Sequence, residues 1–413
     1  MDIAPGAGGL TPAPAHVPAA LVHDFDVYAP GPPEADLFEV YKALQDSAVP
    51  DIFWSRCNGG HWVAKRGDRV LEILKDHQRF SSRHAMVPKS RNSPGAAIPI
   101  QLDPPEHGEY RALLSHAFSI RSIGEMKDDI RAFTVELIDG LAARGGCDFV
   151  ADFAQMFPIG VFLRLVDLPM AHRDALLTSV QRLIHPRPED LAASPTQPLV
   201  DYLSPIVEAR RARPGEDLIS RLGQSEVFGR RLSFEEHLKM CVLLLVGGLD
   251  SVANTLGFFA RFLADNPDHR RRLIAEPALI PRAVEELLRR FPTVAALCRT
   301  AVADVSFGGA PMREGDIVVC PTNQANFDDR LFPDPLRVDF DRRPNIASFG
   351  NGPHKCPGAT LARTELALFI EEWLRRIPDF AVAPGAAVAF KPGINIAYRS
   401  LPLVWSVNGR AAA

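Results

Sequence analysis

The chain has 413 residues, of which 46% are hydrophobic and 23% charged, an ordinary composition for a soluble globular protein. Its formal net charge of −4 lacks the basic surplus of nucleic-acid binders. Six cysteines are scattered without a C-x-x-C pair, which disfavours zinc sites and disulfide frameworks and fits a reducing compartment. The apolar runs are too short to span a bilayer, and the first residues lack signal-peptide character. We therefore expect a cytoplasmic protein with no nucleic-acid or membrane partner.

The first part of the chain predicts a flexible segment followed by a helix and a hairpin. Proline, alanine and glycine are frequent over residues 1–22, and we expect 1–15 to form a flexible N-terminal arm. No linker or repeat interrupts the remainder, so residues 16–413 are predicted to form one domain. Helical spacing of apolar residues predicts a helix over 34–45. A glycine pair between two apolar runs predicts a β-hairpin over 53–64.

A loop rich in proline, glycine and serine follows at residues 86–102, with the apolar side chains Met86, Ile98 and Ile100. A long irregular segment inside a compact domain is often functional, although a plain surface loop is the alternative. The next predicted helix carries His107 and Arg111 four residues apart, so both project from one face. This pair suits an anionic ligand, and an exposed surface pair is the other interpretation.

Amphipathic patterns predict helices over 125–145, 147–168, 170–185 and 196–212. Ser233 and Glu236 then form a capping-box sequence that opens a long helix reaching about residue 266. The middle of this helix is apolar on nearly all sides, which predicts a place in the core.

The middle of the long helix contains two features that are unfavourable without a partner. Gly247 and Gly248 are adjacent, and each glycine costs about 1 kcal/mol relative to alanine in a helix interior. This cost indicates that something flat or small approaches the backbone. Asp250 is expensive to bury unless it has a partner, and Arg187, just after a helix break, is our candidate.

Further along, residues 281–290 predict a helix with Glu286 and Arg289 on one face. An apolar stretch containing Val294 then leads to Arg299. Near the end, residues 390–397 predict a turn and strand that carry Ile394 and Asn395.

One stretch organises the rest of the chain: residues 349–358, with the spacing Phe-Gly-x-Gly-x-His-x-Cys-x-Gly. A predicted helix begins directly after it. A thiol at a helix N-terminus has its pKa lowered by the helix dipole and by free backbone N–H groups. Cys356 is therefore expected to be poised as a thiolate, either a nucleophile or a soft ligand for iron.

This stretch resembles the haem-binding loop of the cytochrome P-450 family, with Cys356 at the position of the thiolate ligand. The resemblance extends from about His16 to Trp405 and is nearest to the bacterial camphor-hydroxylase group. It implies a mainly α fold with small β-sheets (α+β). The expected shape is a triangular, single-domain prism with haem b between a long distal helix and the helix after the cysteine loop.

The resemblance also assigns roles to residues of this chain. Asp250 and Ser251 are the catalytic pair that delivers protons. The haem-binding residues are His107, Arg111, Gly247, Gly248, Arg299, Phe349, His354 and Cys356, and Cys356 is the metal ligand. The substrate contacts are Met86, Ile98, Ile100, Leu243, Val246, Val294, Ile394 and Asn395. The structural charge cluster is Glu286, Arg289 and Arg337.

The implied activity is that of a haem-thiolate monooxygenase hydroxylating an unactivated C–H bond of a small apolar substrate, a monoterpenoid or norisoprenoid. Dioxygen is the co-substrate. Two electrons come from a two-iron ferredoxin with its NADH-dependent reductase, docking near Arg79, Arg111 and Lys355 on a monomer. One alternative is a hydroxylase of a fatty acid or aromatic compound. Another is a non-catalytic haem-thiolate sensor or carrier, which the Asp250–Ser251 pair disfavours.

Four positions depart from the pattern of the camphor hydroxylases. Ser251 stands where threonine is usual. Residues 93–97 offer no tyrosine for a substrate ketone, which puts camphor in doubt. Asn395 adds a polar group near the pocket. Pro357 lacks an N–H, so fewer donors reach the sulfur and a lower reduction potential is expected.

Overall fold

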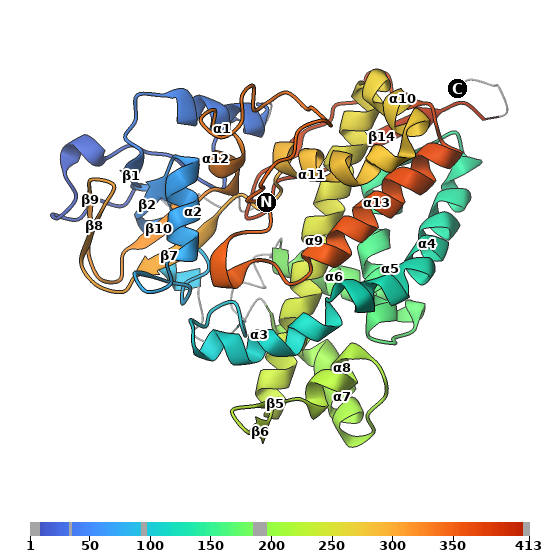
Figure 1. Ribbon diagram of the computed structural model, residues 1–413, viewed down its shortest axis with the longest axis horizontal. Coiled ribbons are helices and arrows are strands. Elements are labelled where there is room, and N and C mark those ends of the chain that lie inside the picture. The colour runs from blue at the N-terminus through green and yellow to red at the C-terminus, as the bar shows by residue number, and fades with distance from the viewer. Residues whose placement is uncertain (1–8, 33–34, 92–96, 185–195, 408–413) are drawn as a thin grey trace.

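The computed structural model describes residues 9–32, 35–91, 97–184 and 196–407. A β-rich half and a helical half lie on either side of the long helix α9 (Figure 1). Thirteen helices have the bounds α1 Leu37–Asp46, α2 Gly67–Lys75, α3 Glu106–Ala117, α4 Ile120–Ala142, α5 Met156–Leu165, α6 Arg173–Ile184, α7 Gln197–Ala212, α8 Leu218–Gln224, α9 Phe234–Asp265, α10 Pro267–Ala275, α11 Ile280–Arg290, α12 Thr322–Asn326 and α13 Ala359–Arg376 in these described ranges.

The strands are short and build small sheets. Within the described ranges their bounds are β1 Ile52–Ser55, β2 His61–Ala64, β3 Phe80–Ser81, β4 Gly146–Asp148, β5 Glu226–Val227, β6 Arg230–Arg231, β7 Leu297–Ala301, β8 Val305–Phe307, β9 Ala310–Met312, β10 Ile317–Cys320, β11 Phe380–Val382, β12 Phe390–Lys391, β13 Ala397–Tyr398 and β14 Pro402–Trp405. The largest sheet has the order β1-β2-β10-β7-β3, and a second has β11-β14-β4. The mainly α architecture with small sheets is confirmed.

The predicted hairpin is present as β1 and β2, which pair antiparallel with Trp54 opposite Trp62. One helix prediction was wrong at its start. Residues 146–148 form strand β4, because their backbone pairs with β14 in the register Cys147 to Leu403. A π-helical turn, Val150–Ala154, follows the strand, and α5 begins at Met156. At the N-terminus, the Thr11 N–H donates to the Arg56 carbonyl at 2.9 Å, while residues 1–8 of the predicted arm lie outside the described residues.

Helix α9 begins at the predicted capping box. The Ser233 N–H donates to Glu236 Oε2 at 2.7 Å, and the Glu236 N–H donates to Ser233 Oγ at 3.1 Å. The helix packs against α5, α7 and α13. Among the described residues it is the one helix long and apolar enough to cross a bilayer by length and composition, and half of its most apolar window is buried.

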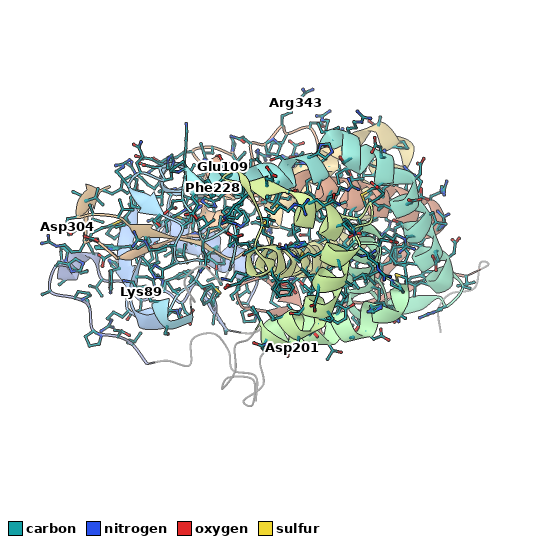
Figure 2. The ribbon with its side chains drawn as sticks, turned by 90° about the horizontal axis from the view of Figure 1, so that it is seen from below. Lys89, Glu109, Asp201, Phe228, Asp304 and Arg343 are labelled. Atoms are coloured by element: carbon teal, nitrogen blue, oxygen red, sulfur yellow. The ribbon has the colours of Figure 1, made fainter. Side chains whose placement is uncertain are left out.

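Helix α3, which carries the predicted haem-binding residues His107 and Arg111, is held against the start of α9. The Tyr110 hydroxyl donates to Glu236 Oε1 at 2.7 Å. The Tyr110 ring also contacts Phe228 edge-on at 6.0 Å between centroids. Phe228 lies in the turn between β5 and β6, and Figure 2 shows it close to Glu109 of α3.

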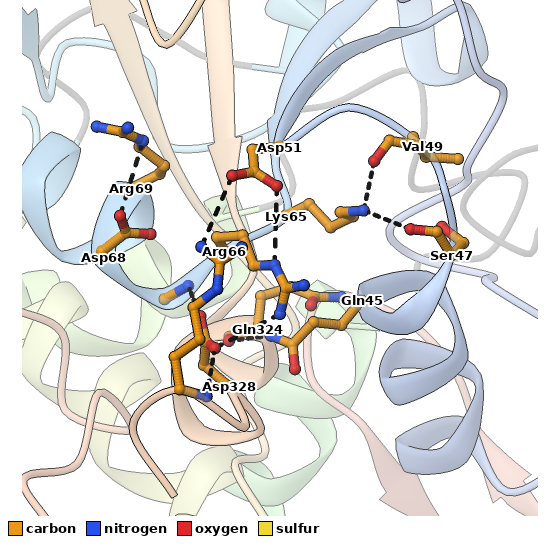
Figure 3. A network of polar contacts seen from close by, with 12 residues as sticks. Gln45, Ser47, Val49, Asp51, Lys65, Arg66, Asp68, Arg69, Gln324 and Asp328 are labelled. Carbon is orange, nitrogen blue, oxygen red and sulfur yellow. Dashed lines mark hydrogen bonds and ion pairs between the residues drawn. The ribbon is translucent and has the colours of Figure 1, made fainter.

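A polar network joins the end of β2 to the segment after α1, and the start of α2 to the segment after α12 (Figure 3). The buried Lys65 ammonium donates to the carbonyls of Ser47 and Val49, and burial lowers its pKa. The Gly67 N–H at the start of α2 donates to the buried carboxylate of Asp328 at 2.8 Å. These contacts anchor α2, the helix on which the cysteine loop rests.

Candidate active site

The cysteine loop is closed by its own backbone. The Cys356 N–H donates to the Phe349 carbonyl at 2.8 Å. The Arg363 guanidinium lies 4.5 Å from the centre of the Phe349 ring and is itself paired with Glu285 of α11. Phe349 is thus held in place by Arg363 of α13, which is itself fixed by Glu285 of α11.

The loop also presses against the end of α2. Gly352 has φ +68°, and a Cβ at this position would lie 2.7 Å from the Leu74 carbonyl oxygen, so a larger residue has no room. The Asn351 Nδ2 donates to the Leu71 carbonyl at 3.0 Å. The glycine pattern of the loop therefore reflects a close contact with a helix from the first quarter of the chain.

The thiol of Cys356 lies just before the N-terminus of α13. Burial raises its pKa, while the Gly358 N–H and the charges of Arg111 and Arg363 act in the opposite direction. The expectation of a lowered thiol pKa was therefore wrong for the chain alone, because burial outweighs the helix terminus. A bound metal ion deprotonates a coordinating thiol outright, so the thiolate form depends on the ligated metal.

The middle of α9 and the cysteine of the loop remain accessible to solvent, although both lie in the interior part of the fold. Gly247 and Gly248 are exposed although they lie in the middle of α9. A Cβ added at either glycine would meet nothing within 4 Å. Cys356 keeps accessible surface as well, although protein packs densely around it. These are the surfaces that a flat group lying between α9 and the cysteine loop would cover.

Four basic side chains gather beside this space. The rings of His107 and His354 lie 4.1 Å apart. Burial lowers the pKa of His354 to about 3, with further lowering by Arg299, His107 and Arg111. Burial also lowers the pKa of Arg299, whose Nη1 donates to the Cys298 carbonyl at 2.7 Å. No carboxylate among the described residues forms an ion pair with Arg299, so the cluster suits an anionic ligand.

One member of the cluster is turned toward the loop. Arg111 donates through Nη2 to the carbonyl of Lys355, directly before the cysteine. The Nε2 atom of His354 is buried and has no hydrogen-bond partner among the described groups. Burial likewise lowers the pKa of His107.

The predicted catalytic pair on α9 begins two residues after the second exposed glycine. Asp250 Oδ2 accepts from Asn254 Nδ2 at 3.0 Å and from Asn395 Nδ2. Burial raises the pKa of Asp250, and the two amides lower it. The Ser251 hydroxyl donates to the Gly247 carbonyl at 3.0 Å. The predicted partner Arg187 lies outside the described residues.

The predicted substrate contacts come from several elements. Asn395 and Val294 form an isolated antiparallel β-bridge. The Ala295 N–H donates to the Ile394 carbonyl at 3.0 Å. Ile98 is buried in an apolar cluster that Val246 of α9 also joins. Leu243 and Met86 are half-buried, whereas Ile100 is 39% exposed. Residues 93–96 of the same loop lie outside the described residues.

Comparisons with known proteins identify the family. The cytochrome P450 family matches residues 196–385. The "Probable cytochrome P450 127A1" of Sinorhizobium fredii is 37% identical over 405 residues, which are 96% of this chain and 97% of that protein. The chain belongs to the cytochrome P450 family. Its haem-thiolate chemistry follows, with haem b as cofactor.

Two more similarities extend over nearly the whole P450. A steroid C26-monooxygenase of Mycolicibacterium smegmatis is 32% identical over 92% of this chain and 98% of that protein. The crystal structure of the cytochrome P450 CYP101C1 superposes with a TM-score of 0.88 at 41% identity, covering 96% of this chain and all of that chain. The relative from Mycolicibacterium smegmatis is named as a monooxygenase, and together with the family match this shows that the chain is a P450 monooxygenase.

The residues present fit haem b. Cys356 would provide the thiolate, and three members of the basic cluster, His107, Arg299 and His354, would meet the two carboxylates of the cofactor. The exposed backbone at Gly247 and Gly248 leaves room for a flat ring and a small ligand. Haem b therefore has a ligand, a charge partner and a surface in this chain.

The structural charge cluster required one correction. Glu286 and Arg289 are fully buried and paired at 2.8 Å, as expected. The second arginine at Glu286 is Arg342, not the predicted Arg337. The backbone explains this: Arg337 contributes its carbonyl, which accepts from Arg289 Nη2 at 3.1 Å.

Sequence reasoning missed two other contributors. Asn254 lies one helical turn after Asp250, and this i, i+4 spacing on α9 was a usable signal. Thr255 donates to the Ser251 carbonyl at 2.7 Å and lies 3.5 Å from the Thr293 hydroxyl. The contact with Thr293 joins segments 38 residues apart, so no local sequence pattern predicts it.

Proposed function

We propose that this P450 hydroxylates an unactivated C–H bond of a small apolar molecule, a monoterpenoid or norisoprenoid. The carrying observation is the set of apolar side chains from separate elements near the Asp250–Ser251 pair, with one amide, Asn395, among them. Pockets of this kind, mostly apolar with few polar groups, suit small hydrocarbon-like ligands.

Each residue of the site has a distinct task in this proposal. Cys356 ligates the cofactor, and His107, Arg299 and His354 hold its carboxylates. Bound haem b supplies dioxygen binding and the oxidising power for C–H hydroxylation. Leu243, Val246, Val294 and Ile394 orient the substrate and exclude water. Asp250 and Ser251 hold and pass the protons that the reaction consumes.

The electron donor is proposed to be a two-iron ferredoxin with its NADH-dependent reductase, meeting a monomer on the cysteine side. Lys355 is exposed there and Arg111 lies beside it. Arg79 contributes less than expected, because it pairs with Asp76 and Glu72. A cytoplasmic location is consistent with this donor.

The test begins with the carbon monoxide difference spectrum of the reduced protein. A strongly red-shifted Soret band is expected, and a band typical of histidine-ligated haem would refute thiolate ligation by Cys356. The ferric protein is then titrated with cineole, β-ionone, camphor, lauric acid, naphthalene and cholesterol.

The titration discriminates among the substrate classes. The largest low-to-high-spin shift is expected from cineole or β-ionone. A larger shift from lauric acid or naphthalene would favour the alternative hydroxylases. A larger shift from cholesterol would place this enzyme with its steroid-oxidising relative.

A further inference from the structure

The tip segment, residues 392–396, lies between β12 and β13. Its backbone is hydrogen-bonded to residues 293–295, which follow α11. The Ala295 N–H donates to the Ile394 carbonyl at 3.0 Å, and the Ile396 N–H donates to the Thr293 carbonyl at 2.7 Å. Two backbone hydrogen bonds therefore flank Asn395 and set its position. The side chain between them points at α9, as its hydrogen bond shows.

Asn395 joins the tip segment to the catalytic pair. Its Nδ2 donates to Asp250 Oδ2, the same oxygen that accepts from Asn254. Asn254 belongs to α9 itself, so it moves with Asp250. Asn395 lies 145 residues away in sequence, so it is the contact through which movement of the tip segment reaches the carboxylate.

The chemistry of these contacts holds the proton-handling groups in a resting arrangement. A side-chain amide donates hydrogen bonds but does not exchange its proton on the time scale of turnover. Among the described residues, Asp250 is thus held by two groups that cannot relay a proton, and the Ser251 hydroxyl is bonded to the Gly247 carbonyl. Among the described residues, the charged side chain whose field acts on Asp250 is Lys391 of β12.

We propose that Asn395 is a positioning residue that couples occupation of the pocket to release of the Asp250 carboxylate. A ligand that presses on Ile394 shifts the tip segment, and the neighbouring Asn395 then withdraws its hydrogen bond. Asp250 becomes free to handle protons only when the pocket is filled. This inference rests on the proposed role of Asp250 in proton delivery.

The test reads the Asp250 carboxyl group directly, without turnover. The infrared band of the protonated carboxyl is titrated with pH in the haem-loaded protein and is assigned by its loss in Asp250→Asn. The probe is 4-phenylimidazole, which binds ferric haem through nitrogen and places its phenyl ring in the pocket. The variants are Asn395→Val, which removes the contact from the tip segment, and Asn254→Val, the matched control that removes the contact from α9.

We expect 4-phenylimidazole to raise the midpoint pH of the Asp250 carboxyl titration in the native protein by about one unit. The reason is that a lost hydrogen bond to the carboxylate favours its protonated form. Asn395→Val is expected to have a raised midpoint already and no further shift with the probe. Asn254→Val is expected to have a raised midpoint and to keep the shift. Thermal unfolding of each variant verifies that the fold is retained.

Two results would overturn the proposal. One is a native midpoint that is the same with and without the probe. The other is a shift in Asn395→Val equal to that of the native protein. Neither depends on the substrate class, so failure of the terpenoid assignment and failure of the coupling are distinguishable.

Discussion

Arg342 supplies the guanidinium group that meets the buried carboxylate of Glu286, with 3.3 Å between Nε and Oε1. Arg289 approaches the same oxygen at 2.8 Å. The Asp339 N–H also donates to it at 3.0 Å. Three donors thus converge on one carboxylate oxygen, at the place where α11 meets the segment that precedes the cysteine loop.

Removing the charge of Glu286 should be severe. Glu286→Gln is expected to lower the free energy of unfolding by about 3–5 kcal/mol, because the buried Arg289 loses its counter-charge. Arg337→Ala, the control, should stay within about 0.5 kcal/mol, since Arg337 contributes its backbone carbonyl. Urea unfolding measures both. A larger loss for Arg337→Ala than for Arg342→Ala would contradict the pairing seen here.

The hydroxyl of Ser251 governs a second prediction. Threonine at this position adds a methyl group that restricts χ1, so the hydroxyl keeps one direction instead of rotating among several. Ser251→Thr should therefore raise the share of consumed dioxygen that appears in product. Ser251→Ala should lower it, with more hydrogen peroxide released. Product and peroxide are measured together, and equal ratios in all three proteins would remove Ser251 from proton handling.

The residue after the ligand cysteine sets the third prediction. The Gly358 N–H reaches the Cys356 sulfur, but Pro357 has no N–H to offer. Pro357→Leu restores a donor and should raise the reduction potential of the loaded enzyme, since a hydrogen bond withdraws electron density from the thiolate. Spectroelectrochemistry gives the potential. Pro357→Ala should raise it similarly, and an unchanged potential in both variants would refute the idea.

The fourth prediction concerns acid stability. Burial lowers the pKa of His61 from 6.5 to about 4. The unfolded chain therefore binds more protons than the folded one between these values. The stabilising contribution of neutral His61 to the free energy of unfolding is fully present above pH 6.5. It falls by about 3 kcal/mol as the pH drops to 4.

His61→Gln removes this titration and should flatten the pH dependence by that amount. The measurement is the free energy of unfolding in urea at several pH values, taken as the difference between native and variant proteins. The difference cancels contributions from the other buried histidines. Curves that remain parallel would show that His61 does not titrate across this window.

The sequence predicted best what is encoded in contiguous residues. The capping box at Ser233 defined the start of α9, since both partners lie within one turn. The glycine pair between two apolar runs was sufficient to predict the hairpin β1–β2. The cysteine loop was recognisable because its residue types and spacing lie within ten positions.

What the sequence did not predict depends on distant pairing. Residues 147 and 148 were predicted to begin a helix, but they lie in strand β4, whose partner strand β14 follows more than 250 residues later. The sequence predicted Arg337 as the later partner of Glu286, and only the path of the backbone shows that Arg342 takes this place. The contact of Asn395 with Asp250 has the same character, since polar residues far apart carry no shared local pattern.

The contact between the cysteine loop and α2 has a consequence for the order in which the protein matures. Asn351 is bonded to Leu71 across 280 residues. During synthesis, α2 leaves the ribosome early, whereas the loop emerges near the end. The contact that positions the cysteine loop therefore cannot form until most of the chain has been synthesised. Capture of haem becomes a late event, and a truncated translation product lacking the loop has no competent site to occupy.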